Sequence, residues 1–325
     1  MDVSVIVPTY NSKNRLGECL GAILKQDFKN FEVIVVNDGS TDGTEQLAKT
    51  FNVKVFSKIN QGPAIARNFG AQKSAGKILV FIDDDCIAEK NWLKEMIKPF
   101  QDPKVVGVQG TYKSQQKELC AIFEQIEIED RYDKIQKAKN LDWTGSYSAA
   151  FRRSVFFETQ GYDESFPTAS GEDTELSFKL VKAGHKLAFN KHAIVYHKHE
   201  TKWLNYFRKK FFRAYWRVLL YRKHTDKILN DSYTPQTLKL QIVLFYLSLI
   251  APIFIILFFN ASLQIILASE LFILFLGLVS AAPFTFKAMR KNFVIGIISP
   301  IILAGRSVVF GLGLIAGGIK GVWLR

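Results

Sequence analysis

Short apolar runs alternate with amphipathic stretches through the first hundred residues of the chain. Four apolar runs have the length of buried strands, at 3–7, 31–36, 53–56 and 77–82. Helical spacing of apolar residues follows the first three runs, at 13–25, 44–50 and 63–74. This alternation predicts a parallel sheet with helices on both faces. From residue 105 the pattern changes to a strand at 105–112, a long helix at 116–137, a short segment at 146–151 and a helix from about 171.

Beyond Leu238 the chain is almost continuously apolar. The stretch 238–259 would be about 33 Å long as a helix, enough to cross a bilayer core of ~30 Å. A second candidate span is 262–284, which carries Glu270. Three such stretches in succession, counting 293–319, predict a membrane domain rather than buried core helices.

The third stretch, 293–319, has basic residues before and after it and contains Pro300 and Arg306. The positive-inside rule then places both of its ends on the cytoplasmic side. We therefore expect a re-entrant or interfacial hairpin of two half-helices that turns near Pro300, with one tilted span as the alternative. Arg306 inside the membrane is expected to contact a lipid phosphate or Glu270.

Charge is concentrated just before the membrane domain. Residues 201–227 hold nine Lys or Arg against one acid, which is +8 of the net charge of +13. Because this segment precedes apolar stretches, anionic lipids explain it better than nucleic acid does. Three cysteines without paired spacing indicate a reducing compartment, and the apolar run 3–7 is too short for a signal peptide, so we expect none. We expect a multi-pass protein of the cell membrane whose N-terminal domain is cytoplasmic.

Three consecutive acids, Asp83, Asp84 and Asp85, follow the strand 77–82 directly. Open α/β sheets bind ligands at the carboxyl ends of their strands. Carboxylates packed this closely repel one another, and Mg²⁺ or Mn²⁺ shared with substrate phosphates relieves the repulsion. A solvated acidic turn is the alternative.

Polar residues also follow the first two strands. Thr9 and Tyr10 offer a hydroxyl and a stacking ring, and Asp38 can accept a hydrogen bond from a base or a ribose. Arg67, one turn into the helix that Pro63 opens, is placed to hold Asp38 or the base. These residues predict a nucleotide crevice, although the same residue types also suit loops and helix caps.

Five motifs, in order and at characteristic spacing over residues 2–200, give the chain its resemblance to family 2 glycosyltransferases of the GT-A fold. They are VIVPTYN at 5–11, VVNDGSTD at 35–42, ARNFG at 66–70, DDD at 83–85 and GED at 171–173. The resemblance implies an α/β domain with a mixed, mostly parallel sheet. It also implies metal-dependent, inverting transfer of a hexose from a nucleotide-diphosphate sugar. The expected organisation is a transferase domain at 1–200, a basic interfacial segment at 201–237 and a membrane domain at 238–325.

The resemblance also assigns roles to residues. On the donor side it implies that the nucleoside is bound by Thr9, Tyr10, Asp38, Arg67 and Asp84. Asp85 matches the acid that holds the metal, and His197 matches a histidine that contacts the metal or the diphosphate in some relatives. Asp173 matches the catalytic base, which removes the proton of the acceptor hydroxyl during inversion. Acids in a first helical turn also simply complement the helix dipole.

On the acceptor side, the resemblance suggests that Trp143 stacks on a sugar, with a core tryptophan as the alternative, and that Glu172 positions the acceptor. The Gln-x-x-Arg-Trp signature of processive synthases is missing. Aromatic and basic residues alternate in its place at 207–217, and this pattern suits a helix in the membrane interface. Arg213 in that segment is expected near the phosphate of a lipid-linked acceptor, although it also fits an ordinary basic flank.

The predicted activity is transfer of one sugar to a lipid-linked saccharide or a surface glycan. A polyprenyl-phosphate sugar synthase is the enzymatic alternative. The non-catalytic alternative is a membrane scaffold with a degenerate transferase domain.

Overall fold

The computed structural model describes residues 2–138, 140–229, 231–259 and 262–323, which form two compact units. The sheet unit comprises residues 1–115 and 135–198, and the helical unit comprises 116–134 and 199–325. The boundary expected at residue 200 therefore lies next to the structural one. The segment 116–134, which the sequence analysis placed in the first domain, groups with the helical unit instead.

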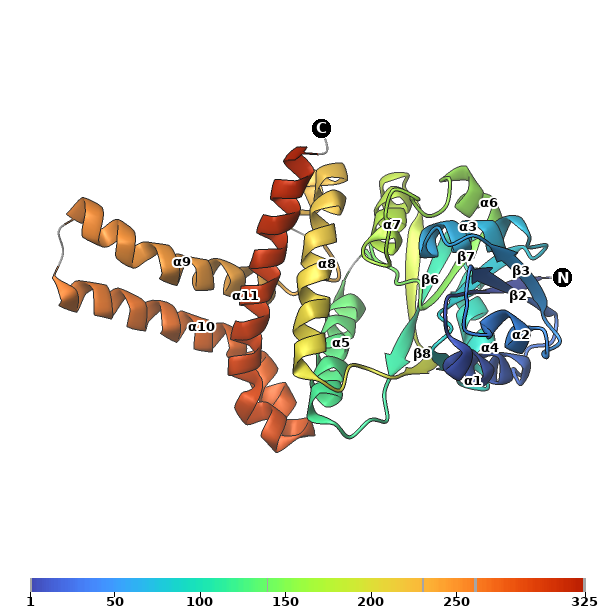
Figure 1. Cartoon of the computed structure of the whole chain (residues 1–325), viewed down its shortest axis with the longest axis horizontal. Coiled ribbons are helices and arrows are strands. Elements are labelled where there is room, and N and C mark those ends of the chain that lie inside the picture. The colour runs from blue at the N-terminus through green and yellow to red at the C-terminus, as the bar shows by residue number, and fades with distance from the viewer. Residues whose placement is uncertain (1, 139, 230, 260–261, 324–325) are drawn as a thin grey trace. The chain divides into compact units, whose positions relative to one another are not determined.

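The sheet unit contains an eight-stranded sheet in the order β3-β2-β1-β4-β7-β6-β8-β5 (Figure 1). Its strands are β1 Val3–Thr9, β2 Phe31–Asp38, β3 Lys54–Lys58, β4 Ile78–Ile82, β5 Cys86–Ala88, β6 Val105–Lys113, β7 Ser148–Arg152 and β8 Lys186–His197. Strands β1 to β4 pair in parallel, as their apolar runs predict. Strand β7 is antiparallel to β4 and β6, which makes the sheet mixed. The α/β fold class expected from the sequence is confirmed.

Helices cover both faces of the parallel half of the sheet. The helices of this unit are α1 Lys13–Leu24, α2 Thr44–Ala48, α3 Pro63–Gln72, α4 Trp92–Ile97, α6 Arg153–Glu158 and α7 Glu172–Lys182, with a 3₁₀ turn η1 at Lys98–Gln101. Val5 and Val7 of β1 join the core formed with α1, whereas Ile6 points to the opposite face. A Cβ at Gly70 of α3 would lie 2.6 Å from the Ile6 side chain, so α3 packs closely on that face.

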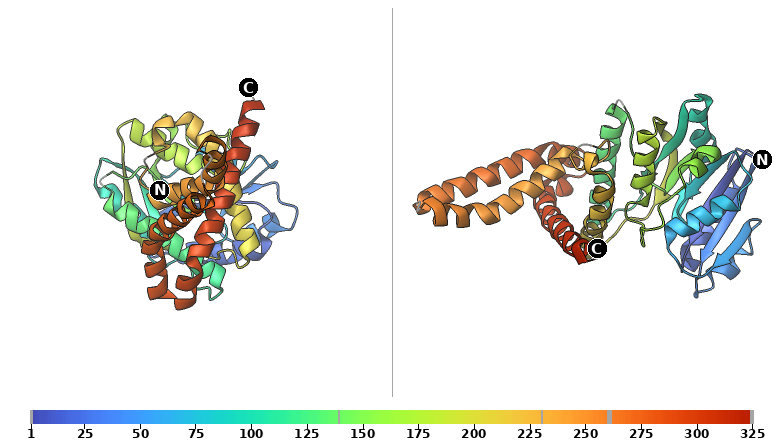
Figure 2. Two further views of the ribbon diagram at one scale, coloured as in Figure 1. Left: turned by 90° about the vertical axis from the view of Figure 1, so that its left-hand side faces the viewer. Right: turned by 90° about the horizontal axis from the view of Figure 1, so that it is seen from above.

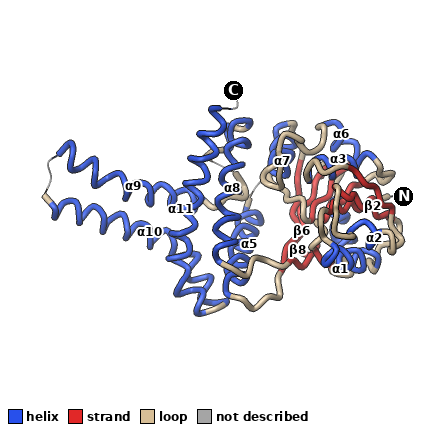
Figure 3. The backbone as a smooth tube through the Cα atoms, viewed as in Figure 1, coloured by secondary structure: helices blue, strands red, loops and turns tan. Residues whose placement is uncertain are grey.

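The helical unit consists of α5 Leu119–Lys137, α8 Trp203–Lys223, α9 Gln236–Phe259, α10 Leu263–Lys291 and α11 Phe293–Trp323, with a 3₁₀ turn η2 at Thr225–Lys227. Helices α9 and α10 run antiparallel as a long hairpin (Figures 1 and 2). Helices α9, α10 and α11 are each long and apolar enough to cross a membrane. Figure 3 shows the contrast between this all-helical unit and the strands of the sheet unit.

The expected turn near Pro300 is wrong, because α11 continues through that residue as one helix of 31 residues. Its packing against α8 accounts for the continuity. A Cβ at Gly313 would collide with the carbonyl oxygen of Phe211, and one at Gly317 with that of Tyr215. The two backbones therefore touch along their length, and glycine is the residue that permits this approach. Apolar helices tolerate an internal proline when neighbouring groups compensate for the lost hydrogen bond.

A buried ion cluster joins the helices of this unit. Glu127 of α5 accepts hydrogen bonds from Lys210 of α8 at 2.8 Å and Arg306 of α11 at 2.6 Å. Arg306, only 6% exposed, also donates to Gln241 of α9 at 2.8 Å. The expectation that Arg306 pairs with Glu270 is thus wrong, because Glu127 supplies its counter-charge. Burial opposes ionisation of Glu127, yet the neighbouring cations hold its pKa down at about 2.

Candidate functional site

A crevice of about 480 Å³ lies where β1, β2 and β4 end. It is lined by residues from the strand ends, from α1 and α3, and from the loop before α7: Pro8, Thr9, Tyr10, Ser12, Arg15, Asp38, Asn60, Gly62, Pro63, Ala66, Arg67, Asp83, Asp84, Asp85, Pro167, Thr168 and Ala169. The structure therefore brings all five predicted nucleoside residues, and Asp85, to one cavity. The carboxyl ends of parallel strands converge here, as in other open α/β sheets.

Asp38 forms part of the crevice wall. Its carboxylate accepts hydrogen bonds from Lys58 Nζ at 2.7 Å and from the backbone N–H groups of Gln61 at 3.1 Å and Gly62 at 2.8 Å. Gly62 has a φ of 97°, a conformation that favours glycine and turns its N–H toward the carboxylate. The expected contact between Arg67 and Asp38 is absent among the described contacts, because Lys58 is the cation beside Asp38.

Thr9 and Asp84 are paired at the bottom of the crevice. The Thr9 hydroxyl donates to Asp84 Oδ2 at 2.6 Å. Burial and, to a smaller extent, the neighbouring Asp85 raise the pKa of Asp84, against the lowering effect of hydrogen bonds from Ser12 and Thr9. Tyr10 beside them is 50% exposed, so its ring is open to contact with a ligand.

Asp85 and His197 lie together at one end of the acid triplet. The antiparallel pairing of Cys86 with His197 brings β5 and β8 into register here, and Asp85 Oδ2 lies 3.4 Å from His197 Nε2. Arg15 Nη1 is 3.5 Å from the same oxygen. Burial would raise the pKa of Asp85, but the hydrogen bond and charge of His197 and the charge of Arg15 lower it overall.

The spacing of Asp85 and His197 suits a divalent ion, because adjacent ligands of an octahedral ion at ~2.1 Å lie about 3 Å apart. Among the described residues no cluster of three His, Cys, Asp or Glu could hold a metal alone. Mg²⁺ in enzymes is commonly held by one or two carboxylates together with substrate phosphates. The pair therefore fits a metal whose remaining ligands come from a diphosphate.

Arg67 links the acid triplet to the start of α7. It is 2% exposed and donates from Nη2 to Asp83 Oδ1 at 2.8 Å and from Nη1 to Glu172 Oε1 at 2.9 Å. Glu172 is 1% exposed, and its other oxygen accepts from the backbone N–H groups of Ser170 and Gly171. Burial and the adjacent Asp173 raise the pKa of Glu172. Glu172 thus supports the loop before α7 from behind, a contact that sequence spacing alone did not indicate.

Asp173 lies in the first turn of α7, after Gly171 with its φ of 142°. Its carboxylate accepts a hydrogen bond from the Thr174 N–H at 2.6 Å, and burial raises its pKa. Trp143 packs next to this turn, where its indole N–H donates to Thr174 Oγ1 at 3.1 Å. The Trp143 ring is 4% exposed, which matches the core position weighed as its alternative. Arg213 is exposed on α8 in the helical unit.

Several crevice residues carried no sequence signal. Arg15 and Lys58 stand beside Asp85 and Asp38 because α1 and β3 fold against the strand ends. Asp83 belongs to the acid triplet, but its pairing with Arg67 depends on the fold. The loop residues Pro167–Ala169 reach the crevice from more than 80 residues after the triplet, a distance over which one sequence gives no signal.

Comparison with known proteins agrees with this geometry. Residues 4–158 match the model of glycosyl transferase family 2. The chain carries a family 2 glycosyltransferase domain. Its expected GT-A fold is matched by a solved mannosyltransferase, PcManGT from Pyrobaculum calidifontis in complex with GDP-Man and Mn²⁺. That structure aligns with 99% of this chain and 87% of its own, with a TM-score of 0.61 and 20% identity.

Curated relatives match the transferase domain over part of their length. Glycosyltransferase AglE of Haloferax volcanii is 30% identical over 203 residues, which is 58% of this chain and 64% of AglE. A glycosyltransferase of Rickettsia bellii is 38% identical over 115 residues, which is 34% of this chain and 17% of that protein. The chain thus spans less than two thirds of the length of either relative.

Proposed function

We propose that this protein is a membrane-anchored, inverting glycosyltransferase. It moves one hexose from a nucleotide-diphosphate sugar to a lipid-linked saccharide or a growing surface glycan. The observation that carries the proposal is the strand-end crevice, where Asp85 of the lining lies 3.4 Å from His197 and beside the predicted nucleoside residues. The family match and the GDP-Man and Mn²⁺ in the mannosyltransferase PcManGT support the same reading.

In this reaction the bond between the anomeric carbon and the nucleoside diphosphate breaks while a bond to the acceptor oxygen forms on the opposite face. Asp173 takes the proton of the acceptor hydroxyl as that oxygen attacks. A divalent ion held by Asp85 and His197 would supply positive charge against the diphosphate. Tyr10 stacks on the base, and Thr9 and Asp84 orient the ribose. Arg67 and Glu172 hold the loop that presents Asp173.

The helical unit serves as the anchor. Helices α9, α10 and α11 have the length and hydropathy of membrane spans. Basic residues of α8 precede them, and Arg290 and Lys291 end α10. By the positive-inside rule these basic segments stay on the cytoplasmic side, and the transferase domain with them. Direct transfer to a polyprenyl phosphate would use the same crevice, and the mass of the lipid product separates the two reactions.

A donor screen tests the proposal. The full-length protein in detergent is titrated with UDP- and GDP-linked sugars in Mn²⁺ and again in EDTA. We expect at least one donor to bind in Mn²⁺, to lose its affinity in EDTA and to release its nucleotide slowly without acceptor. Binding of no nucleotide sugar, or release that EDTA leaves unchanged, would contradict the proposal.

A further inference from the structure

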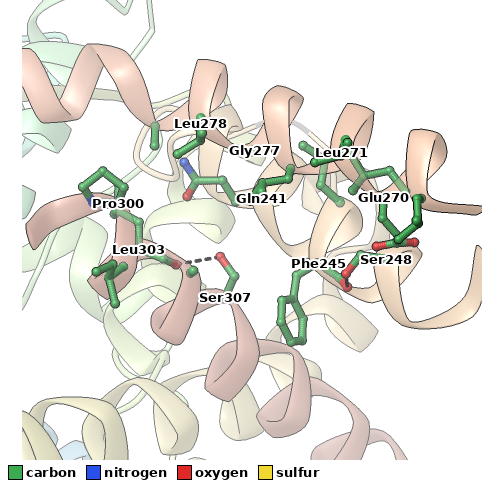
Figure 4. A pocket seen from close by; sticks show the side chains of 17 residues that line it. Gln241, Phe245, Ser248, Glu270, Leu271, Gly277, Leu278, Pro300, Leu303 and Ser307 are labelled. Atoms are coloured by element: carbon green, nitrogen blue, oxygen red, sulfur yellow. Dashed lines mark hydrogen bonds between the residues drawn. The ribbon is translucent and has the colours of Figure 1, made fainter.

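The helical unit contains a second cavity, of about 500 Å³, between α9, α10 and α11 (Figure 4). Its walls are mainly aliphatic, with Leu244 from α9, Leu274 from α10 and Leu303 from α11. A volume of this size is typical of small-molecule sites, which measure ~300–1,000 Å³. Because all three helices have the character of membrane spans, the ligand that fits these walls is a hydrocarbon chain.

Gly277 faces the cavity. It lines the wall on α10, and a Cβ built there would meet no atom within 4 Å. The close approach of two helices therefore does not explain this glycine, in contrast to Gly313 and Gly317. A long side chain at this position would instead project into the cavity.

The two polar ends of the cavity differ in charge. At one end Gln241 accepts a hydrogen bond from Arg306, a cation of the buried cluster behind it. Arg306 Nε is buried and has no hydrogen-bond partner among the described residues. At the other end stands Glu270, whose Oε1 is also buried without a partner in the described part of the chain.

This asymmetry orients a ligand. The guanidinium of Arg306 behind Gln241 favours an anionic group at that end, whereas the carboxyl group of Glu270 disfavours one at the other end. A lipid with a phosphate head would therefore lie with its head at Gln241 and its chain running toward Glu270. One cavity accommodates one chain, and the arginine behind Gln241 favours an anionic lipid over a zwitterionic phospholipid with two chains.

We propose that this cavity binds the first part of the hydrocarbon chain of the lipid-phosphate acceptor. The inference rests on the proposed function and narrows its acceptor to a lipid that carries a phosphate on a single chain. The Gln241–Arg306 end takes the phosphate side, and the walls formed by Leu244, Leu274 and Leu303 hold the chain.

Photocrosslinking tests the assignment. The full chain in phosphatidylcholine nanodiscs is irradiated with a polyprenyl phosphate that carries a diazirine near its head, and the labelled peptides are mapped. We expect labels within 241–248, 267–281 and 300–307. Gly277→Leu fills the cavity and should reduce labelling by about tenfold or more. The matched control is Gly318→Leu on α11, where a Cβ also meets no atom within 4 Å but which does not line the cavity, and it should label like the wild type.

Two further experiments are needed. One distinguishes a polyprenyl phosphate from a phospholipid as the bound lipid, and the other distinguishes failure of the cavity assignment from failure of the proposed function. Unlabelled polyprenyl phosphate should compete with the probe, and excess phosphatidylcholine should not. Equal labelling by a diazirine phosphatidylcholine, or undiminished labelling of Gly277→Leu, overturns the cavity assignment. Acceptor-independent release of nucleotide should be the same in Gly277→Leu and the wild type. If the wild type releases none, the proposed function fails, while the contrast in labelling still decides the cavity.

Discussion

The two units use charged side chains in opposite ways. In the sheet unit, Asp83, Asp84 and Asp85 gather like charges at the rim of a crevice, with Arg67 and His197 as partial partners. In the helical unit, Glu127 is enclosed by Lys210 and Arg306, and all three are nearly inaccessible to solvent. Surplus negative charge that remains open to a cavity is a feature of a site that awaits a cation, whereas enclosed opposite charges hold helices together.

This difference separates two kinds of prediction. Loss of Asp85 should affect the reaction and leave the fold unchanged, because its cationic partner Arg15 is exposed to solvent. Loss of Glu127 should lower the stability of the helical unit and leave donor chemistry unchanged. Lys210 and Arg306 would then remain buried without the carboxylate that they share.

The largest effect is expected for Asp85→Asn. This change removes the anionic ligand beside His197, so metal-dependent nucleotide binding and transfer should fall below detection while the melting temperature stays unchanged. Nucleotide release in Mn²⁺ and thermal unfolding measure the two quantities. Asp102→Asn is the control in the same unit, since that surface carboxylate pairs with Lys186 and the nearby backbone, away from the crevice lining. Retention of full activity by Asp85→Asn would remove the metal assignment.

Asp173→Asn should act on transfer alone. The general base is lost, so transfer should fall by ~10²-fold or more while donor affinity is roughly kept. A collapse of donor affinity with normal transfer at saturation would instead make Asp173 a binding residue.

The pH dependence of transfer tests the same residue in the wild type. Burial raises the pKa of Asp173, so its protonated form persists to higher pH than for an ordinary aspartate. Only the ionised form accepts a proton, and transfer should therefore decline as the pH falls through this raised pKa. Transfer rates measured at saturating donor, from neutral to acidic pH, check the expectation. A decline confined to the ordinary pKa range of aspartate would argue against it.

Glu127→Gln should destabilise the helical unit without affecting donor hydrolysis. It leaves Lys210 and Arg306 buried without a counter-charge, a loss of typically 3–5 kcal/mol. Unfolding in detergent and limited proteolysis of α8 and α11 report the change.

Asp133→Asn gives the smallest effect and serves as the matched control in α5. Its carboxylate is largely exposed and pairs with Lys287, so the change should cost less than about 1 kcal/mol. If both α5 variants lost the same small amount of stability, the buried cluster would not hold the helices together.

Local patterns predicted the parts of the fold that depend on neighbours in sequence. The apolar runs located β1 to β4, and the polar residues after them located the crevice. The full length of strand β8 was not accessible from local pattern, because Lys186, Asn190 and Lys191 interrupt the apolar residues of its first half. The pairing of Arg67 with Glu172 spans 105 positions, and the continuity of α11 depends on contacts with α8, so neither was accessible from local pattern.

The bond between Glu127 and Arg306 joins residues 179 positions apart. A ribosome releases α5 long before it makes α11. Glu127 must therefore remain without this partner while the rest of the sheet unit and the apolar hairpin are synthesised. Closing such long-range contacts is slow and leaves intermediates exposed in the meantime. The buried ion cluster that begins with Glu127 of α5 is therefore complete only when α11 has been synthesised. If synthesis stopped within α11 before Arg306, α5 would lack the partner of its buried Glu127, although α5 was made more than 150 residues earlier.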